Sequence, residues 1–464
     1  MILLILFIGY LLRLIGIGQS FWLDEAIQGL ESRGSIFYLW KIPGDFQPPL
    51  FHYLAHFWLI FGSAEWQLRL LPIFLGVGTI YLIWLFACEL TNIKTANIAA
   101  FLLALSPFHI YYSQEFRPYA LSAFLATWSF YLFAKIINGQ KINQWLYILV
   151  NTMGLYSLYF FPFIMLSQLV ISFFLYKNKF ILLLKSLLIS VIFWLPWLPM
   201  FFRQLRIGTG WANQYYLWRI SVGTPLFKAL PLIFAKFWLG NITIDNKFLY
   251  GLLVLGLFLL SSFLVYKARK LNEKITLLLL TVLLIPIFTA FLISFFIPVI
   301  APKRLLLVLP EFYILLALGI TNLGKKIKTP IFCLTVSLNL IFLGIYYTNP
   351  RFQREQWRQA VAWVEAKASS QSLVIFEFAS DFGPWSWYQT NKVELKAIFA
   401  NEDFSIEETM LQITQNKKTI FLFGYLADMT DPEKKASLWL SQNDYHLIET
   451  HDFPGVGFIY VYTK

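Results

Sequence analysis

Long apolar stretches separated by short polar turns run along the chain from residue 2 to residue 348. A stretch of about 17–25 predominantly apolar residues is long enough to cross a bilayer as a helix. The first stretch has no cleavage site after it, so we expect it to be retained as a span. The pattern predicts eleven spans, at residues 2–18, 68–90, 95–112, 116–136, 143–159, 161–176, 180–201, 247–266, 275–298, 304–323 and 329–348.

The apolar run 49–62 is treated differently, because its length of about 14 residues is too short for a span. We expect it to form a helix that lies along the membrane surface or dips into the membrane. With eleven spans and a cytoplasmic N-terminus, every inner turn is basic, as the positive-inside rule requires. The loops 19–67 and 202–246 and the tail then lie outside. The basic residues of the inner turns are Lys94, Lys135, Lys141, Lys177, Lys179, Lys267, Arg269, Lys270, Lys274, Lys325, Lys326 and Lys328.

Composition supports a membrane protein. The chain is 58% hydrophobic and 13% charged, whereas soluble domains carry about 25% charged residues. This excludes an ordinary soluble enzyme and a disordered chain. The net charge of +12 therefore indicates a membrane protein rather than a nucleic-acid-binding protein. The two cysteines, Cys88 and Cys333, lie in apolar runs and exclude a disulfide scaffold.

The last part of the chain has a different character. Residues 1–349 hold 26 basic and 10 acidic residues, whereas residues 350–464 hold 11 basic and 15 acidic ones. The tail has a helical pattern over 354–367 and strand-like runs at 372–378, 419–423 and 458–462, the last after a Pro454-Gly455 turn. We therefore expect a helical polytopic membrane domain, residues 1–349, with a large first outer loop at 19–67. A small extracytoplasmic α/β domain, residues 350–464, should follow it.

The first outer loop carries an acidic pair, Asp24 and Glu25, flanked by aromatic and apolar residues. Two adjacent carboxyl groups at a rim of low dielectric constant repel each other, so one of them titrates at a higher pH. Such a group can act as a general base. The alternative is a solvated helix cap in a loop.

Three further places carry candidate chemistry, each with a structural alternative. His52 and His56, after the Gln47-Pro48-Pro49 segment, have a spacing that can bind a metal. No third ligand is evident nearby in the sequence, which favours the alternative of interfacial histidines among aromatic residues. Glu115 and Arg117 could form a local ion pair at a span end. The functional alternative is that Glu115 is a second acid and that Arg117 binds a phosphate. Lys303 and Arg304, at an outer span end, either hold a lipid phosphate or anchor the span by snorkelling.

Taken together, these segments resemble the GT-C membrane glycosyltransferases. The resemblance is to family 39-like enzymes, which include protein O-mannosyltransferases and the lipid A aminoarabinose transferase. It is specific over residues 1–140 and loose from 140 to 300. The matching residues are Arg13, Trp22–Glu25, Pro48-Pro49-Leu50, Phe61-Gly62, Glu65-Trp66, Arg69–Pro72, Ser106-Pro107 and Tyr112–Tyr119, with weaker matches at Lys303–Pro310 and Gln356–Arg358.

The resemblance implies an inverting transferase that moves a sugar from a polyprenyl-phosphate carrier to an acceptor on the non-cytoplasmic face. Asp24 matches the catalytic base, with Glu25 as its companion, and Glu115 matches a second acid. The implied contacts to the carrier phosphate and substrate are Arg117, Lys303, Arg304, Tyr119, Gln47 and His52. The chain departs from the aminoarabinose transferase at Phe46-Gln47, where that enzyme has Glu-Lys.

The implied partners are the carrier-linked donor, a lipid, glycan or protein acceptor, and membrane lipids, but no nucleic acid. A divalent cation is possible as a cofactor, with no ligand set assigned. The implied location is the bacterial plasma membrane, with a cytoplasmic N-terminus and the tail domain outside.

Two other classes of function stay open. A transporter would need ionisable groups near the bilayer midplane, and Glu311 is the acid placed inside a predicted span. A non-catalytic lipid-binding or assembly protein would not need the acidic pair, so its function would survive replacement of Asp24 by alanine.

Overall fold

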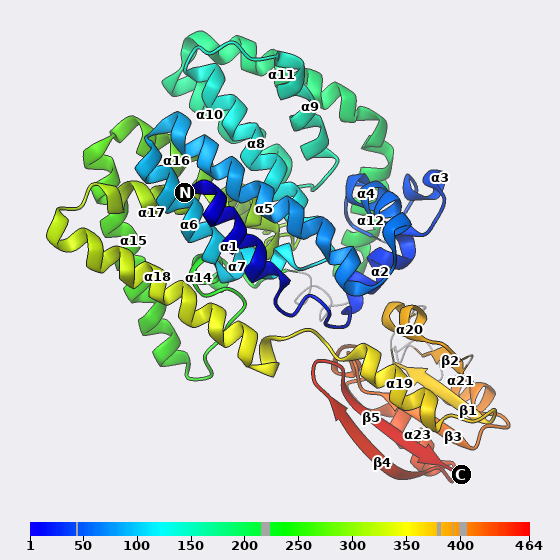
Figure 1. Ribbon diagram of the computed structural model, residues 1–464. Helices are drawn as coiled ribbons and strands as arrows, with labels where there is room; N and C mark the ends of the chain where they lie inside the picture. Colours follow the sequence, from blue (N-terminus) through cyan, green and yellow to red (C-terminus); the bar gives the residue numbers. More distant parts are fainter. Residues whose placement is uncertain (43–44, 215–222, 378–381, 392, 399–405) are drawn as a thin grey trace. The chain divides into compact units, whose positions relative to one another are not determined.

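The computed structural model describes residues 1–42, 45–214, 223–377, 382–391, 393–398 and 406–464 (Figure 1). It divides into two compact units. Unit 1 comprises Met1–Ile17 and Gly34–Thr348, and unit 2 comprises Gly18–Arg33 and Asn349–Lys464. The first outer loop is thus divided, with its first part grouped with the tail. The predicted domain division, 1–349 and 350–464, stays a prediction.

The secondary structure of unit 1 is entirely helical over its described residues. Its α-helices are α1 (Ile2–Leu14), α3 (Ile36–Leu39), α4 (Leu50–Trp58), α5 (Glu65–Leu90), α6 (Ile93–Leu105), α7 (Pro107–Ser113), α8 (Tyr119–Ile137), α9 (Gln144–Leu155), α10 (Phe161–Leu175), α11 (Lys177–Trp194), α12 (Leu198–Gln214), α14 (Leu226–Leu239), α15 (Lys247–Leu271), α16 (Glu273–Ile293), α17 (Leu309–Thr321) and α18 (Lys325–Thr348). Three 3₁₀ helices, η1 (Leu59–Phe61), η2 (Leu195–Trp197) and η3 (Pro302–Val308), connect them.

Seven of the described helices are long and apolar enough to cross a membrane, or eight if the bent pair α6–α7 counts as one span. The 62° bend of that pair follows from its sequence, because Pro107 cannot continue the preceding helix and Ser106 caps the next one by accepting a hydrogen bond from the His109 N–H. Every predicted span contains a helix, but those at 2–18, 143–159 and 161–176 have only 13, 12 and 15 residues. The polytopic helical class is confirmed, and the count of eleven stays a prediction.

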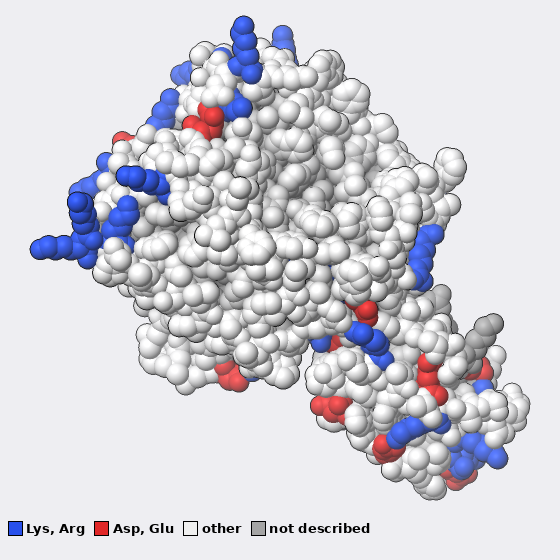
Figure 2. All heavy atoms as spheres, in the orientation of Figure 1, with Lys and Arg blue, Asp and Glu red and all other residues white. Residues whose placement is uncertain are grey.

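Charged side chains are unevenly distributed over unit 1. Figure 2 shows Lys and Arg gathered along its top and left edge, whereas the broad middle of the same face is drawn almost entirely white. An uncharged band beside a basic edge is the arrangement that the positive-inside rule predicts.

The helices of unit 1 pack closely around α5, α6, α8 and α17. Helix α5 packs against α6 and α8, and α17 packs against α6 and α15. Gly319 of α17 faces the backbone of α15, because a Cβ there would collide with the carbonyl oxygen of Leu264. Small residues permit this close approach between helices in membranes.

Arg13 ties α1 to the helices beside it. Its side chain is fully buried and donates hydrogen bonds to the carbonyl oxygens of Gly9, at 2.7 Å, and Ala104, at 3.3 Å. The guanidinium also lies 2.7 Å from Nδ1 of His109. The arginine therefore connects α1 with the bend between α6 and α7.

Unit 2 is a five-stranded mixed sheet with helices. Strand order is β2-β1-β3-β5-β4, with β2, β1 and β3 parallel and β5 and β4 antiparallel. Its elements are α2 (Leu23–Ser32), η4 (Pro350–Phe352), α19 (Trp357–Lys367), β1 (Ser372–Phe376), α20 (Gly383–Tyr388), β2 (Glu394–Ala397), α21 (Ile406–Ile413), β3 (Thr419–Phe423), α22 (Ala427–Thr430), α23 (Lys435–Gln442), β4 (His446–Phe453) and β5 (Gly457–Thr463).

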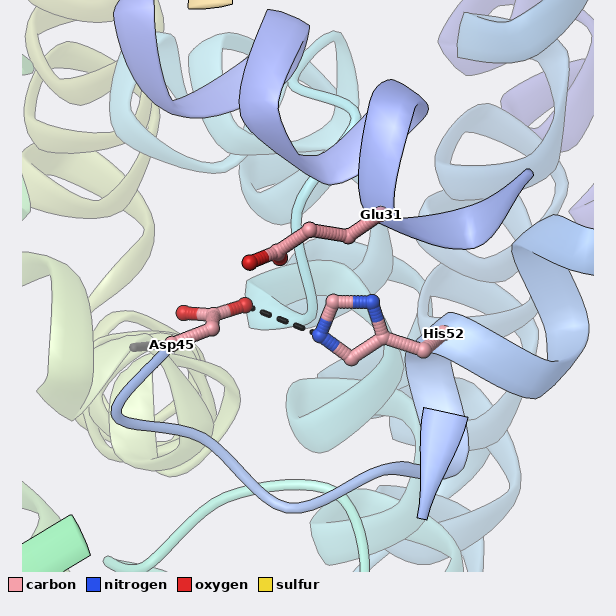
Figure 3. Close-up of side chains that lie close together, drawn as sticks. All are labelled: Glu31, Asp45 and His52. Carbon is pink, nitrogen blue, oxygen red and sulfur yellow. Dashed lines mark hydrogen bonds and ion pairs between the residues drawn. The ribbon is translucent and has the colours of Figure 1, made fainter. Parts of the chain in front are cut away.

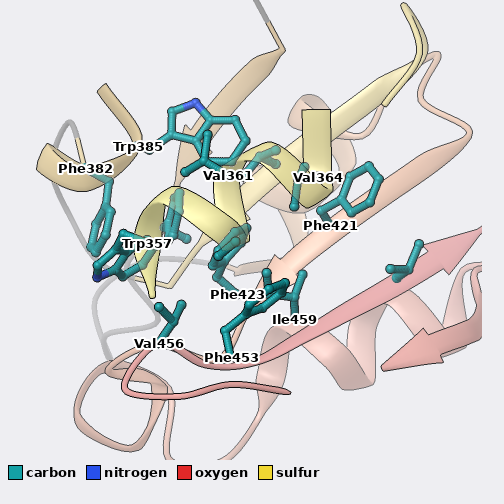
Figure 4. Close-up of a cluster of buried hydrophobic side chains, with 14 residues drawn as sticks. Trp357, Val361, Val364, Phe382, Trp385, Phe421, Phe423, Phe453, Val456 and Ile459 are labelled. Carbon is teal, nitrogen blue, oxygen red and sulfur yellow. The ribbon is translucent and has the colours of Figure 1, made fainter. Parts of the chain in front are cut away.

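Alternation along the central strands gives the sheet a core on each face. Val374 and Phe376 of β1 belong to the cluster that contains Trp357 (Figure 4). Leu373 and Ile375 belong to a second cluster, together with Met410 of α21. The predicted small α/β domain is confirmed.

The β4–β5 hairpin turns where the sequence predicts a turn. Gly455 and Gly457 have positive φ angles of 80° and 84°, which glycine adopts at little cost. The backbone N–H of Val456 donates to the Phe453 carbonyl across this turn, at 2.9 Å. The hairpin thus completes the antiparallel side of the sheet.

Candidate functional site

A buried polar cluster in unit 1 is built around Asp45, which lies between α3 and α4. Oδ2 of Asp45 lies 2.9 Å from Nε2 of His52, on α4 (Figure 3). Oδ1 accepts a hydrogen bond from the Arg117 guanidinium at 3.3 Å. Gln47 joins the cluster through its side-chain nitrogen, which donates to Asp45 and lies 3.0 Å from Nε2 of His52. The structure thus brings together three of the predicted site residues, Gln47, His52 and Arg117.

The charges around Asp45 keep it ionised. Its exposed fraction is 9%, and those of His52 and Arg117 are 1% and 8%. Burial by itself would raise the pKa of the Asp45 carboxyl, but the positive charge of Arg117 and the hydrogen bonds from His52 and Arg117 outweigh it and lower the pKa to about 2. The cluster therefore holds an aspartate whose charge is compensated by a guanidinium.

Helix α12 fixes the loop that carries Asp45. The side-chain nitrogen of Gln204, on α12, donates to the backbone carbonyls of Asp45, at 2.6 Å, and Ile42, at 2.8 Å. Asp45 is not among the site residues predicted from the sequence. Its position two residues before the Gln47-Pro48-Pro49 segment and seven before His52 is the signal that could have found it.

A second group of predicted residues meets where η3 packs against α8. Nζ of Lys303 lies 5.6 Å from the ring centroid of Tyr119, in the range of a cation–π contact. Arg304, the next residue, donates to the Val299 carbonyl at 2.6 Å. The Tyr119 ring in turn packs edge-on against Tyr112, with centroids 5.4 Å apart. Lys303 and the rings of Tyr119 and Tyr112 thus lie together, with Arg304 next to Lys303 along η3.

Glu115 lies in the turn between α7 and α8, two residues before Arg117. Its side chain is buried, with an exposed fraction of 1%. The backbone N–H of Arg117 donates to the Glu115 carbonyl at 2.7 Å and tightens the turn. The same turn therefore presents a buried acid and the cation that binds Asp45.

Asp24 and Glu25 occupy the first turn of α2, in unit 2. An acidic first turn suits the positive end of the helix dipole. Glu25 is fully buried, whereas Asp24 is half-buried. The charge of Asp24 acts on Glu355 and on Tyr425 of the same unit. The predicted base, Asp24, therefore has Glu355 as a neighbour, a carboxyl group that was not predicted as a site residue.

The two histidines of α4 differ in their surroundings. His52 contacts Asp45 and Gln47, as described, whereas the His56 ring packs edge-on against Phe57, with centroids 5.4 Å apart. Asp45 and His52 offer one oxygen and one nitrogen, the donor types that zinc and related cations take. The positive charge of Arg117 at the same carboxylate would oppose a cation there. The residues of this cluster therefore fit a divalent cation only in part.

Comparison with known proteins shows which family and which folds the chain resembles. A family model described as dolichyl-phosphate-mannose-protein mannosyltransferase matches residues 46–200. ArnT from Cupriavidus metallidurans bound to undecaprenyl phosphate superposes with a TM-score of 0.60, at 10% identity over 99% of this chain and 97% of that one. The chain has the GT-C fold. Its predicted resemblance to family 39-like GT-C glycosyltransferases is confirmed.

Two further structures agree with this assignment. ArnT from Cupriavidus metallidurans in the apo state gives a TM-score of 0.58 at 10% identity, over 99% of this chain and 96% of that one. The Archaeoglobus fulgidus oligosaccharyltransferase in complex with Zn and sulfate gives 0.54 at 15% identity, over 98% and 72%. No curated protein sequence matches the chain. The matches to solved structures cover nearly the whole GT-C chain described here, so the likeness in fold extends beyond residues 46–200.

Proposed function

We propose that this chain is an inverting glycosyltransferase that moves a sugar from a polyprenyl-phosphate carrier to an acceptor outside the cytoplasm. The observation that carries the proposal is the pairing of Lys303 with Tyr119 beside Arg304, in a chain with the GT-C fold. Two cations at one end of a membrane helix suit a lipid phosphate. A solved structure with this fold, ArnT, is bound to undecaprenyl phosphate, which supports the same class of ligand here.

The grouping of the first loop with the tail supports the proposed topology. Residues Gly18–Arg33 and the tail form one compact unit, so we place α2 and the tail on the same side of the membrane. The basic edge of unit 1 in Figure 2 supports a cytoplasmic location for the short turns between its spans. On this basis we assign the proposed reaction to the non-cytoplasmic side.

The proposed mechanism is a single displacement. The carboxylate of Asp24 accepts the proton of the acceptor hydroxyl, whose oxygen forms a bond to the anomeric carbon. The bond from that carbon to the phosphate oxygen breaks on the opposite side, and the lipid phosphate leaves with the electron pair. Lys303 and Arg304 stabilise the charge of this leaving group. Attack from the opposite side inverts the anomeric configuration.

Glu25, Glu115 and the Asp45 cluster have supporting roles in this proposal. Glu25 orients the first turn of α2. Glu115 and Arg117 shape the turn before α8, with Gln47 and His52 holding Asp45 against Arg117.

Replacement of Asp24 tests the proposed base. Asp24→Asn keeps the size of the side chain and removes the proton acceptor, so transfer should fall by about 10²–10⁴-fold. The assay uses purified protein, labelled polyprenyl-phosphate sugar and envelope acceptor. Asp428→Asn, on the short helix α22 of the same unit, is the control and should keep the wild-type rate. A wild-type rate in Asp24→Asn, with normal expression, would rule out Asp24 as the base.

Replacement of Lys303 and Arg304 tests the phosphate site. Hydrogen bonds to charged groups contribute about 1.5–3 kcal/mol each, so the K303Q/R304Q variant should raise KM for the carrier-linked donor by at least about tenfold. K325Q/K326Q, at the start of α18, removes the same charge and should leave KM unchanged. An unchanged KM in K303Q/R304Q would show that these residues anchor the helix instead.

A further inference from the structure

Helix α2, which carries Asp24, is held by the tail domain along one side. The backbone N–H of Phe21 donates to the hydroxyl of Tyr388, on α20, at 2.6 Å. Gly29 faces Trp387, where a Cβ would lie 2.7 Å from the ring. The Oγ of Ser20 donates to the carbonyl oxygen of Glu355. The start of the first outer loop is therefore packed onto the tail as part of the same unit.

The carboxyl group of Glu355 lies at the N-terminal end of α2. It accepts hydrogen bonds from the indole N–H of Trp357, at 2.6 Å, and from the hydroxyl of Tyr425, at 3.2 and 3.3 Å. The backbone N–H of Leu23, the first residue of α2, faces this carboxyl and lowers its pKa. The first N–H groups of a helix have no partner within the helix, and the Glu355 carboxyl lies where it can cap this end of α2.

The side chains that donate to Glu355 are themselves packed in the tail core. Trp357 is fully buried in the tail core (Figure 4). Its ring stacks on Phe423 with centroids 5.9 Å apart and packs edge-on against Tyr425 at 4.9 Å. The sheet core therefore fixes the Glu355 carboxyl, and Glu355 fixes the first turn of α2.

Asp24 lies in that same turn, close enough for its negative charge to act on Glu355. Burial raises the pKa of Glu355 to about 7, and the negative charge of Asp24 contributes to the rise. The hydrogen bonds from Trp357 and Tyr425 act in the opposite direction and lower the pKa. The titratable groups that act on Glu355 are thus Asp24 and Tyr425.

We propose that Glu355 is a positioning residue that holds the first turn of α2 and thereby orients Asp24 for proton transfer. The inference rests on the proposed function, and it assigns the tail domain a role in the reaction. A misplacement of about 1 Å can cost about 10²-fold in rate, so a carboxyl that fixes this turn affects kcat without touching the donor.

The first test is kinetic, with a matched control. Glu365 also accepts backbone N–H groups in the tail, from Thr390 at 2.7 Å and Asn391 at 2.8 Å, and these lie outside α2. We expect E355Q to lower kcat by about 10- to 100-fold with KM for the donor unchanged, and E365Q to keep both. Equal losses in E355Q and E365Q would overturn the proposal.

A double-mutant cycle separates positioning from a general loss of structure. If Glu355 acts through Asp24, E355Q should cause no further loss in the D24N background, because groups that act as a unit are not additive. A further loss of tenfold in D24N would overturn the proposal.

A second variant keeps the Glu355 carboxyl and removes the backbone N–H of Leu23. Leu23→Pro deletes the backbone N–H at the first helical position, which tolerates proline, and Leu23→Ala keeps it. We expect L23P to reproduce the kcat loss of E355Q and L23A to stay near wild type. Equal rates in L23P and L23A would contradict the capping role.

Hydrogen exchange distinguishes failure of this proposal from failure of the proposed function. The amides of α2 should exchange faster in E355Q than in wild type or E365Q, whatever reaction the protein catalyses. Unchanged exchange would overturn the positioning role. Faster exchange without any sugar transfer by the wild-type protein would overturn the proposed function alone.

Discussion

Asp45 in unit 1 and Glu355 in unit 2 are both carboxyl groups shielded from water, yet their pKa values move in opposite directions. Asp45 has the guanidinium of Arg117 beside it, and its pKa falls to about 2. Glu355 has the neutral donors of Trp357 and Tyr425 and the negative charge of Asp24, and its pKa rises to about 7. The difference shows that the neighbouring charges decide the state of each group, because burial acts in the same direction on both.

The two environments suit different tasks. A permanently charged Asp45 holds Arg117, and with it the turn before α8, in one arrangement. Glu355 can hold or release a proton near neutral pH. We therefore expect perturbation of the first region to affect stability most, and perturbation of the second to affect catalysis and its dependence on pH.

The largest effect on stability should come from Arg117→Gln. This change removes the positive charge that compensates the Asp45 carboxylate, so that Asp45, like Glu355, has no cation beside it among the residues that the structure describes. Removing one partner of a buried ion pair costs about 3–5 kcal/mol. The free energy of unfolding in mixed micelles should fall by that amount, and D45N/R117Q should recover much of it. The exposed Arg203→Gln, on α12, is the control. A loss in R117Q no larger than in R203Q would show that the pair is weak.

A smaller effect should come from Glu377, a second uncompensated carboxyl of unit 2. Burial and the neighbouring Asp431 carboxyl raise its pKa to about 8 from 4.5. Between these values the folded state binds more protons than the unfolded state, so stability should fall as pH rises from 4.5 to 8. Glu377→Gln should flatten this slope in thermal unfolding of the full chain, whereas the exposed Glu407→Gln should not. An unchanged slope in E377Q would contradict the raised pKa.

The smallest effect should come from removal of metal ions. Arg117 already compensates the charge of Asp45, so a divalent cation is not needed for that purpose. We expect EDTA to leave the rate of transfer unchanged in wild type. Loss of activity in EDTA and its recovery with zinc or manganese would instead assign a cation to the Asp45 cluster.

The sequence was sufficient for the helices of the predicted spans and for the buried strands of the tail. Apolar stretches located a helix at every predicted span, and the strongly apolar strands β1, β3 and β5 were found in the tail. Strands β2 and β4 were missed because their residues are mostly exposed, so they lack the apolar pattern of a buried strand. Both are the edge strands of the sheet.

The sequence could not show which residues meet across long separations. Arg117 was expected as a phosphate contact, and its contact with Asp45 depends on how the first loop folds against the turn before α8. Glu355 gave no signal because its role depends on Leu23 and Asp24, which lie far from it along the chain. Contacts of this kind follow from tertiary structure rather than from local periodicity.

The most direct test of the central claim follows both products of a single turnover. Purified protein is incubated with polyprenyl-phosphate sugars of known anomeric configuration, and the released lipid and the glycosylated product are identified by mass spectrometry and NMR. We predict one polyprenyl phosphate released for each sugar transferred, with inverted configuration at the anomeric carbon. Transfer with retained configuration, or no release of polyprenyl phosphate from any donor, would contradict the proposed function.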